Sequence, residues 1–234
     1  MKHEWLARWE SGQTGWHEAG GNSALRKFWP RLPAGNRVLV PLCGKTPDLL
    51  WLAKQGLEVT GVELSEIAAR AFFVEMGISF ETETHGNLLC FRGVDHAVTI
   101  VCGDYFQFSD EPFDALYDRA ALVALPPELR PDYVDHTRSL LKPGAEQLLI
   151  TLEYDQAKAN GPPFSVLPEE VGEYWPELRR AGDMSALGNV PPKFMEAGIE
   201  EFVEAVWLTD GNRSRPKNRS LTQIFRAFCS FSQF

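Results

Sequence analysis

Gly44 and Glu63 are the residues whose types and spacing best suit ligand chemistry. They lie 19 positions apart, at the ends of two apolar runs that predict buried strands, VLVPL (38–42) and LEVTGVEL (57–64). Carboxyl ends of adjacent parallel strands meet at one edge of a sheet, where open α/β folds bind ligands. A carboxylate there accepts ribose hydroxyls, whereas a pyrophosphate needs a G-x-G-x-x-G turn, of which only Gly44 remains. S-adenosylmethionine, a nucleoside without a pyrophosphate, fits both features. The alternative is that Glu63 is a surface acid.

Two further predicted strands end on polar residues that we place at the same edge. AVTIVCGD ends with Gly103 and Asp104, where a carboxylate would accept the amino group of an adenine and backbone would meet the ring edge. A turn with an exposed acid is the alternative. FDALYDR ends with Asp118 and Arg119. An arginine that faces a ligand crevice needs an anion or a carboxylate as its partner. The alternative is that Arg119 forms a structural salt bridge.

The first residues of the chain are rich in tryptophan. Trp5 and Trp9 precede the glycine-rich stretch SGQTGWHEAGG, and Trp16 lies within it. We interpret them as an aromatic lid that excludes water and offers ring faces to a cation; ordinary helix packing is the alternative. His17 is a candidate general base, but a single histidine in a glycine-rich loop is more typical of a polar surface.

The remaining pattern alternates strands and helices, which predicts parallel β-α-β units. We expect a doubly wound, mostly parallel α/β sheet whose last strand is antiparallel. The sequence between 78 and 96 has room for a hairpin. Helices are expected at 2–11, 22–29, 46–56, 65–77, 126–144 and 168–180, and strands at 38–42, 57–64, 87–91, 97–104, 113–119, 146–154 and 199–209.

Composition and charge limit the partners. The chain has 234 residues and a net charge of −9, while residues 211–234 carry five basic groups and no acid. We expect one domain over 1–210, with a lid segment at 1–30 and a disordered basic tail at 211–234. A negative body disfavours nucleic acid, and no apolar run reaches the ~20 residues that cross a bilayer. The four cysteines form neither a disulfide nor a metal pattern. We expect a cytoplasmic monomer without a metal.

Several motifs in order resemble the bacterial thiopurine S-methyltransferases, from about Glu4 to Thr209. The motifs that carry the resemblance are HEWLARWESGQTGWHEAGG, VLVPLCGK, GVELSE, YDRAALVAL, ITLEYD and GPPFSV. The resemblance implies a seven-stranded, Rossmann-like class I methyltransferase sheet. It also implies S-adenosylmethionine as the methyl donor, and a small thiol or chalcogen compound as the acceptor.

The resemblance also assigns residues. Its cofactor positions correspond to Trp9, Leu42, Glu63 and Arg119, with backbone at Gly103 and Asp104 holding the adenine. Trp5 and Trp16 match aromatic residues that cover the site. Trp16 is close to the acceptor and replaces a phenylalanine common in the family, which would narrow the acceptor pocket. Lys193 is the nearest equivalent of a second arginine found near the acceptor in animal members.

The chemistry expected is a direct displacement at a sulfonium methyl group. The donor is already activated, so the enzyme needs little acid–base catalysis. It has to align the reactants and exclude water, and alignment contributes roughly 7–11 kcal/mol. In this hypothesis Glu63 anchors the ribose and Gly44 allows close approach of the methionine part. Arg119 favours the ionised acceptor, and Asp118 orients Arg119.

Three other functions are weighed against this one. The first is methylation of halide, thiocyanate, or inorganic selenium or tellurium species on the same scaffold. The second is a catalytically inactive nucleoside-binding module. The third is an NAD-dependent oxidoreductase, which the depleted glycine turn disfavours.

Overall fold

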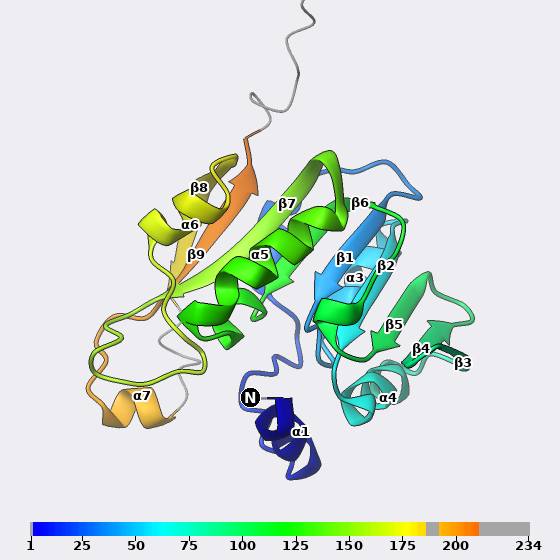
Figure 1. Ribbon diagram of the computed structural model, residues 1–234, viewed down its shortest axis with the longest axis horizontal. Coiled ribbons are helices and arrows are strands. Elements are labelled where there is room, and N and C mark those ends of the chain that lie inside the picture. Colours follow the sequence, from blue (N-terminus) through cyan, green and yellow to red (C-terminus); the bar gives the residue numbers. More distant parts are fainter. Residues whose placement is uncertain (1, 186–191, 211–234) are drawn as a thin grey trace, which may run out of the picture.

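The computed structural model describes residues 2–185 and 192–210, so the predicted tail at 211–234 lies outside the described residues. Within this part of the chain, nine strands form one sheet in the order β3-β4-β5-β2-β1-β6-β7-β9-β8 (Figure 1). The strands are β1 (Arg37–Pro41), β2 (Glu58–Glu63), β3 (Phe80–His85), β4 (Leu88–Gly93), β5 (Val98–Cys102), β6 (Phe113–Arg119), β7 (Leu141–Glu153), β8 (Leu178–Ser185) and β9 (Val203–Thr209).

The sheet confirms the predicted class and extends it. Strands β5, β2, β1, β6 and β7 are parallel, and β9 lies antiparallel between β7 and β8. With β9 and β8 they make seven strands, the number that the resemblance implied, although the sequence pattern predicted a helix over the first residues of β8. The hairpin β3–β4 adds two more, because β4 pairs antiparallel with the edge of β5. The sheet therefore has nine strands where the resemblance implied seven.

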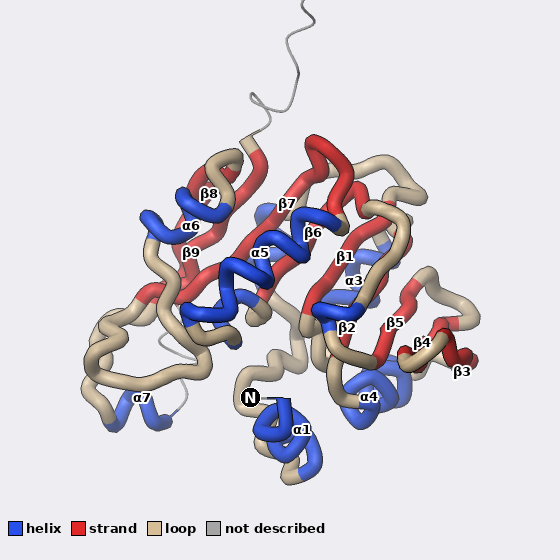
Figure 2. The backbone as a smooth tube through the Cα atoms, in the orientation of Figure 1, coloured by secondary structure: helices blue, strands red, loops and turns tan. Residues whose placement is uncertain are grey.

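Helices cover both faces of the sheet, with α5 in front of it and α3 behind it in Figure 1, and Figure 2 shows the same layers by element type. One buried apolar cluster packs α2, α3 and α4 against the sheet, and a second packs α5 and α6 against the other face. The helices are α1 (Lys2–Glu10), α2 (Ser23–Phe28), α3 (Asp48–Lys54), α4 (Glu66–Met76), α5 (Arg130–Ser139), α6 (Pro168–Tyr174) and α7 (Pro192–Glu196), with short 3₁₀ turns at η1 (Tyr105–Gln107), η2 (Leu122–Ala124) and η3 (Pro127–Leu129).

Two of the predicted helices were too long. The helix predicted at 168–180 ends at Tyr174, and the residues after it form β8. Pro176 explains the break, because a residue that precedes proline avoids the α conformation and Trp175 has φ −132°. The helix predicted at 126–144 is α5, which ends at Ser139, and the Pro-Gly pair lies in β7.

The N-terminal segment lies beyond the carboxyl ends of the parallel strands, where Figure 1 shows α1 below the arrowheads of β1 and β2. Its contacts with the body include an ion pair between Lys2 and Asp104 and a hydrogen bond of 2.9 Å from the backbone N–H of Asn22 to Asp48 Oδ1. Asp48 is buried and also accepts from the Tyr117 hydroxyl at 2.8 Å. The N-terminal segment is thus held at the carboxyl edge of the sheet, and its role as a lid stays a prediction.

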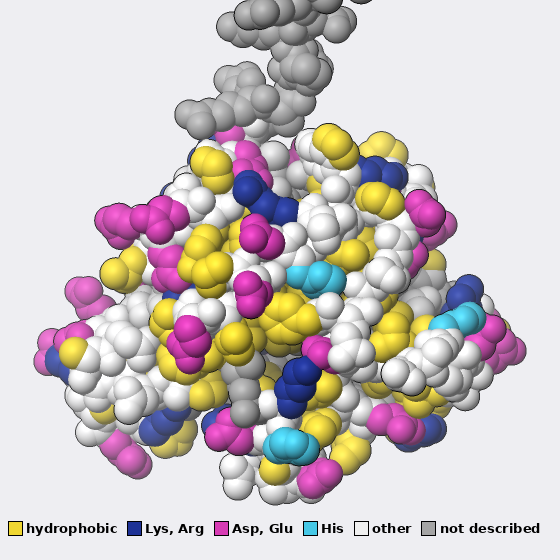
Figure 3. Space-filling view, in the orientation of Figure 1, with side chains coloured by type: hydrophobic (Ala, Val, Ile, Leu, Met, Phe, Trp, Pro, Cys, Tyr) yellow, Lys and Arg dark blue, Asp and Glu magenta, His cyan; other side chains and the backbone are white. Residues whose placement is uncertain are grey.

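The surface carries charges of both signs, dispersed among apolar side chains over the face in Figure 3. Among the described helices, none combines the length and the apolar character that crossing a bilayer requires.

Candidate functional site

A cavity of about 880 Å³ lies at the carboxyl edge of the sheet, under the N-terminal segment. Its wall comes from that segment, from the ends of β1, β2 and β6, and from β7 and β9 on the far side. This volume lies within the usual range for small-molecule sites. Eight of the residues that the sequence singled out line it: Trp5, Trp9, Trp16, His17, Leu42, Gly44, Glu63 and Arg119.

Glu63 is held rigidly at the end of β2. Its Oε2 accepts the backbone N–H of Gly44 at 2.8 Å, and its Oε1 accepts that of Ser65 at 2.8 Å. Burial raises the pKa of Glu63, while hydrogen bonds from the backbone N–H groups of Ser65, Gly44 and Leu64 oppose that rise. Two backbone donors thus fix the carboxylate in one orientation at the cavity wall.

The Glu63 carboxylate fits a nucleoside with a free ribose. A carboxylate offers about four lone-pair sites, and the two backbone bonds use one on each oxygen. The remaining sites can accept two neighbouring hydroxyl groups, which is the demand of a ribose. The donor set at this end of the cavity is therefore suited to S-adenosylmethionine.

The turn after β1 brings backbone close to the cavity. Gly44 has φ +55°, and a Cβ added to it would lie 3.2 Å from Cζ2 of Trp9. Leu42 also has a positive φ, +46°, although it is not glycine. Such strain is concentrated at functional sites. Gly44 is thus needed both for the backbone conformation and for the place that Trp9 occupies.

The three predicted tryptophans pack together over the cavity. Trp16 meets Trp5 edge to face at 5.0 Å between ring centroids and Trp9 at 5.6 Å. The Arg8 guanidinium lies 5.1 Å from the centroid of the Trp5 ring. Trp9 is buried, whereas Trp5 and Trp16 are partly exposed. The cluster is an aromatic cover that comes entirely from the N-terminal segment.

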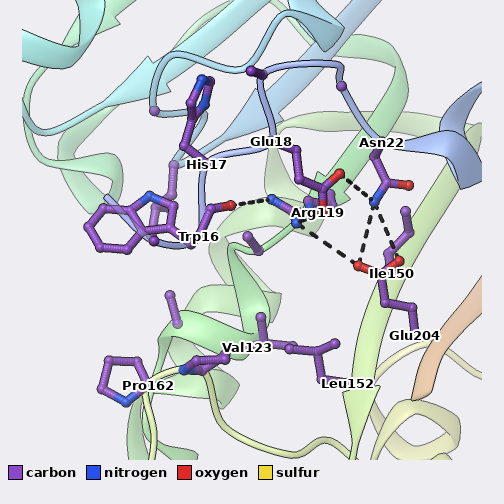
Figure 4. A pocket seen from close by; sticks show the side chains of 18 of the residues that line it. Trp16, His17, Glu18, Asn22, Arg119, Val123, Ile150, Leu152, Pro162 and Glu204 are labelled. Carbon is purple, nitrogen blue, oxygen red and sulfur yellow. Dashed lines mark hydrogen bonds and ion pairs between the residues drawn. The ribbon is translucent and has the colours of Figure 1, made fainter. Parts of the chain in front are cut away.

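Arg119 joins the end of β6 to this cover. Its Nη1 donates to the Trp16 carbonyl at 3.0 Å and its Nη2 donates to Glu18 Oε1. Glu204, from β9, is 4.0 Å from the same Nη2. Figure 4 shows Glu18, Asn22 and Glu204 around the guanidinium at one end of the cavity. Arg119 therefore faces the cavity as predicted, with carboxylates as its neighbours.

Asp118 lies elsewhere, because successive residues of a strand point to opposite faces of the sheet. Its carboxylate is fully buried and accepts from the Tyr133 hydroxyl at 2.7 Å and from the backbone N–H groups of Ala121 and Leu122. Burial raises its pKa to about 6, against the opposing effect of these bonds. Glu18, and not Asp118, holds Arg119. The expectation that Asp118 orients Arg119 thus has no contact to support it.

Gly103 and Asp104 follow β5, the neighbour of β2, but they are not part of the cavity wall. A Cβ at Gly103 would overlap Leu88, and Asp104 caps η1 by accepting the Phe106 N–H at 3.3 Å. Their place near the adenine stays a prediction, which rests on the position of β5 beside β2 in the sheet.

Lys193 and His17 differ in their place relative to the cavity. The Lys193 ammonium donates to the carbonyls of Asn160 and Pro162 at 2.9 and 2.8 Å. Pro162 lines the cavity, but Lys193 itself is not part of the wall. His17 does line the cavity, and burial, with Lys45 next in effect, lowers its pKa.

Sequence reasoning missed the polar residues at the far end, Glu18, Asn22 and Glu204. Glu18 and Asn22 lie within or beside the glycine-rich stretch, where residue type and position do not signal a place in a cavity wall. Glu204 is one of several acids in a strand that alternates, and alternation alone does not tell which acid faces a cavity. In the part of the chain that the structure describes, no group of three His, Cys, Asp or Glu side chains is arranged to hold a metal ion.

Comparisons with known proteins place the chain in a family. The family model described as thiopurine S-methyltransferase matches residues 1–212. A thiopurine S-methyltransferase of Pseudomonas aeruginosa (strain UCBPP-PA14) is 45% identical over 217 residues, covering 88% of this chain and 97% of that protein. Another, of Pseudomonas putida (strain GB-1), is 43% identical over 214 residues and covers 87% and 96%.

The solved structures agree on the fold. The 1,6-didemethyltoxoflavin-N1-methyltransferase of Burkholderia thailandensis, solved with S-adenosylhomocysteine, superposes with a TM-score of 0.57 at 18% identity, covering 89% of this chain and 87% of that chain. A TehB-like methyltransferase of Corynebacterium glutamicum gives 0.51 at 17% identity, covering 89% and 98%. At these identities the likeness concerns the fold alone.

Proposed function

The chain belongs to the thiopurine S-methyltransferase family, and on that basis we propose that it transfers the methyl group of S-adenosylmethionine to aromatic or heterocyclic thiols such as thiopurines. One observation carries the proposal. The same cavity has at one end the Glu63 carboxylate, which accepts two backbone hydrogen bonds, and at the other end Arg119 with its polar neighbours Glu18, Asn22 and Glu204.

The donor would be held at the ends of β1 and β2. Bound S-adenosylmethionine supplies an electrophilic methyl group on a sulfonium centre. Glu63 accepts the ribose hydroxyls, Gly44 leaves room at the turn, and Trp9 and Leu42 supply apolar wall. Gly103 and Asp104, at the next strand end, are proposed to meet the adenine.

The acceptor would lie between the aromatic cover and the far wall. Trp16, Val123, Ile150 and Leu152 are among the residues that make this part of the cavity largely apolar (Figure 4). An aromatic ring is well suited to such a wall, and the cover of indole rings excludes water from the reacting sulfur. Aligned reactants gain roughly 7–11 kcal/mol from positioning, so a positioned thiolate needs little further chemistry.

Arg119 contributes electrostatically in this proposal. Its guanidinium lies at the cavity wall and favours a negative sulfur over a protonated one, although Glu18 offsets part of its charge. Its bond to the Trp16 carbonyl also fixes the cover in place. Arg119 therefore has two roles in this proposal: it stabilises the negative sulfur of the acceptor and it holds the aromatic cover.

The test is methyl transfer from labelled donor to a panel of acceptors: thiophenol, a thiopurine, iodide, thiocyanate and selenite. Turnover of the first two, lost in Glu63→Ala and kept in Glu66→Ala, would support the proposal; Glu66 is exposed on α4 and not part of the wall. Turnover of only the inorganic acceptors would contradict it, as would donor binding without any S-adenosylhomocysteine formed.

We propose that the enzyme works as a cytoplasmic monomer on a small-molecule thiol or chalcogen acceptor, without nucleic acid. The net charge of −9 opposes a polyanion as partner. Gel filtration with light scattering tests the monomer, and a dimer would contradict it.

A further inference from the structure

Glu204 is the cavity-lining carboxylate without a close partner among the described residues. Glu63 accepts two backbone bonds of 2.8 Å, and Glu18 is bonded to Arg119. Glu204, in contrast, has only the Asn22 side-chain amide at 3.5 Å from either oxygen and the Arg119 Nη2 at 4.0 Å. Both contacts are at the outer limit of an interaction.

Glu204 lies in largely buried, partly apolar surroundings, where a carboxylate needs a close hydrogen-bond donor. Its side chain is 13% exposed, on a strand next to the apolar residues Ile150 and Leu152 of β7. Burial raises its pKa, Arg119 lowers it, Glu18 and Asp48 raise it, and the Asn22 bond lowers it. A largely buried carboxylate of this kind requires a hydrogen-bond donor, and the cavity is where one would enter.

We propose that Glu204 accepts the ring N–H of a heterocyclic thioamide and takes its proton while the neighbouring sulfur is methylated. The inference rests on the proposed function and specifies its acceptor. Heterocyclic thiols with nitrogen next to the C–S carbon exist largely as N–H thiones, so a donor sits beside the nucleophile. Thiophenols have no such donor and ionise at sulfur instead.

The step balances without another reactant. The N–H bond breaks and the proton goes to a Glu204 oxygen. The electron pair of the N–H bond forms the ring C=N bond. The C=S π electrons become the pair that forms the new S–CH₃ bond. The bond between that methyl and the sulfonium sulfur breaks, and its electrons leave with the thioether. The positive charge of the sulfonium and the negative charge of the Glu204 carboxylate are both neutralised.

Two acceptors that differ in one ring atom provide the test. 2-Mercaptopyridine is a thione with N–H beside C=S, and thiophenol is its isostere without the nitrogen. The measured quantity is the ratio of kcat/KM for the first to kcat/KM for the second. This ratio is independent of how much of a variant is folded, because both values come from the same sample.

In Glu204→Gln we expect the ratio to fall roughly ten- to hundredfold, the range for a hydrogen bond to a charged group. Glu201→Gln is the matched control, an exposed acid on the same segment outside the cavity wall, and should keep the wild-type ratio. If Glu204→Gln is insoluble, Glu204→Asp should lower the ratio, because its carboxylate is drawn back by one methylene.

The opposite results are equally specific. An unchanged ratio in the Glu204 variants, including equal losses with both acceptors, would overturn the inference and leave Glu204 a structural residue. Wild-type protein that methylates neither acceptor would instead contradict the proposed function.

Discussion

The Gly44 backbone N–H donates a 2.8 Å hydrogen bond to Glu63 Oε2, so the turn after β1 and the end of β2 form one bonded unit. One residue lies in the turn after β1 and the other at the end of β2, and each holds the other in place. A change at either should therefore affect the donor end as a whole.

Replacing Glu63 with Ala should raise the dissociation constant of S-adenosylmethionine about ten- to hundredfold, because a hydrogen bond to a charged group contributes ~1.5–3 kcal/mol. Calorimetric titration measures it, with Glu66→Ala as control. Unchanged donor affinity in Glu63→Ala would show that the donor is held elsewhere.

Replacing Gly44 with Ala should weaken donor binding through Trp9. The positive φ of +55° costs about 1 kcal/mol of stability with any side chain, and the new methyl would meet Trp9. Gly35→Ala is the matched control, because Gly35 has φ +82° but nothing within 4 Å of an added Cβ. Both should lower the free energy of unfolding, and only Gly44→Ala should weaken donor binding. Equal donor affinity in the two variants would argue against close packing at this turn.

Replacing Arg119 with Gln should loosen the aromatic cover. Two bonds to the N-terminal segment are lost, and amide hydrogen exchange over residues 15–21 should accelerate about tenfold. Arg180→Gln removes an arginine that pairs with Glu153 and Asp183, and should leave exchange at 15–21 unchanged. Wild-type exchange rates in Arg119→Gln would mean that other contacts hold the cover.

Asp118 should make stability depend on pH in an unusual direction. Its pKa of about 6 in the fold exceeds its ordinary value of 3.8, so the folded state binds the proton more tightly than the unfolded state. Stability from this group is therefore present below pH 4 and is lost as pH rises through 6, by up to about 3 kcal/mol. The unfolding free energy of wild type minus that of Asp118→Asn, from urea titrations, should fall between pH 4 and pH 6.5. A difference that is flat or rises would show that Asp118 is not protonated there.

The donor end was predictable because it follows from local patterns. Apolar runs ending on Gly44, Glu63 and Arg119 locate strand ends, and parallel strands bring their carboxyl ends to one edge. The same rule also selected Asp118, whose side chain contacts Tyr133 and not Arg119. The rule places a residue at the edge but does not say to which face of the sheet its side chain points.

The acceptor end could not be read from local patterns. Glu204 reaches the cavity because β9 enters antiparallel beside β7, a pairing between distant parts of the chain. Glu18 lies in a stretch without regular structure, where neither period nor propensity applies. The predicted helix at 168–180 ran into the first three residues of β8, because local propensity does not reveal the pairing of β8 with β9.

The order of these segments along the chain has a consequence for synthesis. The strands that place Gly44 and Glu63, together with their neighbours β5 and β6, have all left the ribosome once β6 has been synthesised, whereas the opposite end of the cavity waits for β9. A nascent chain can thus assemble its nucleoside-facing half long before Glu204 arrives, and methyl-transfer competence should be among the last properties that the growing protein gains.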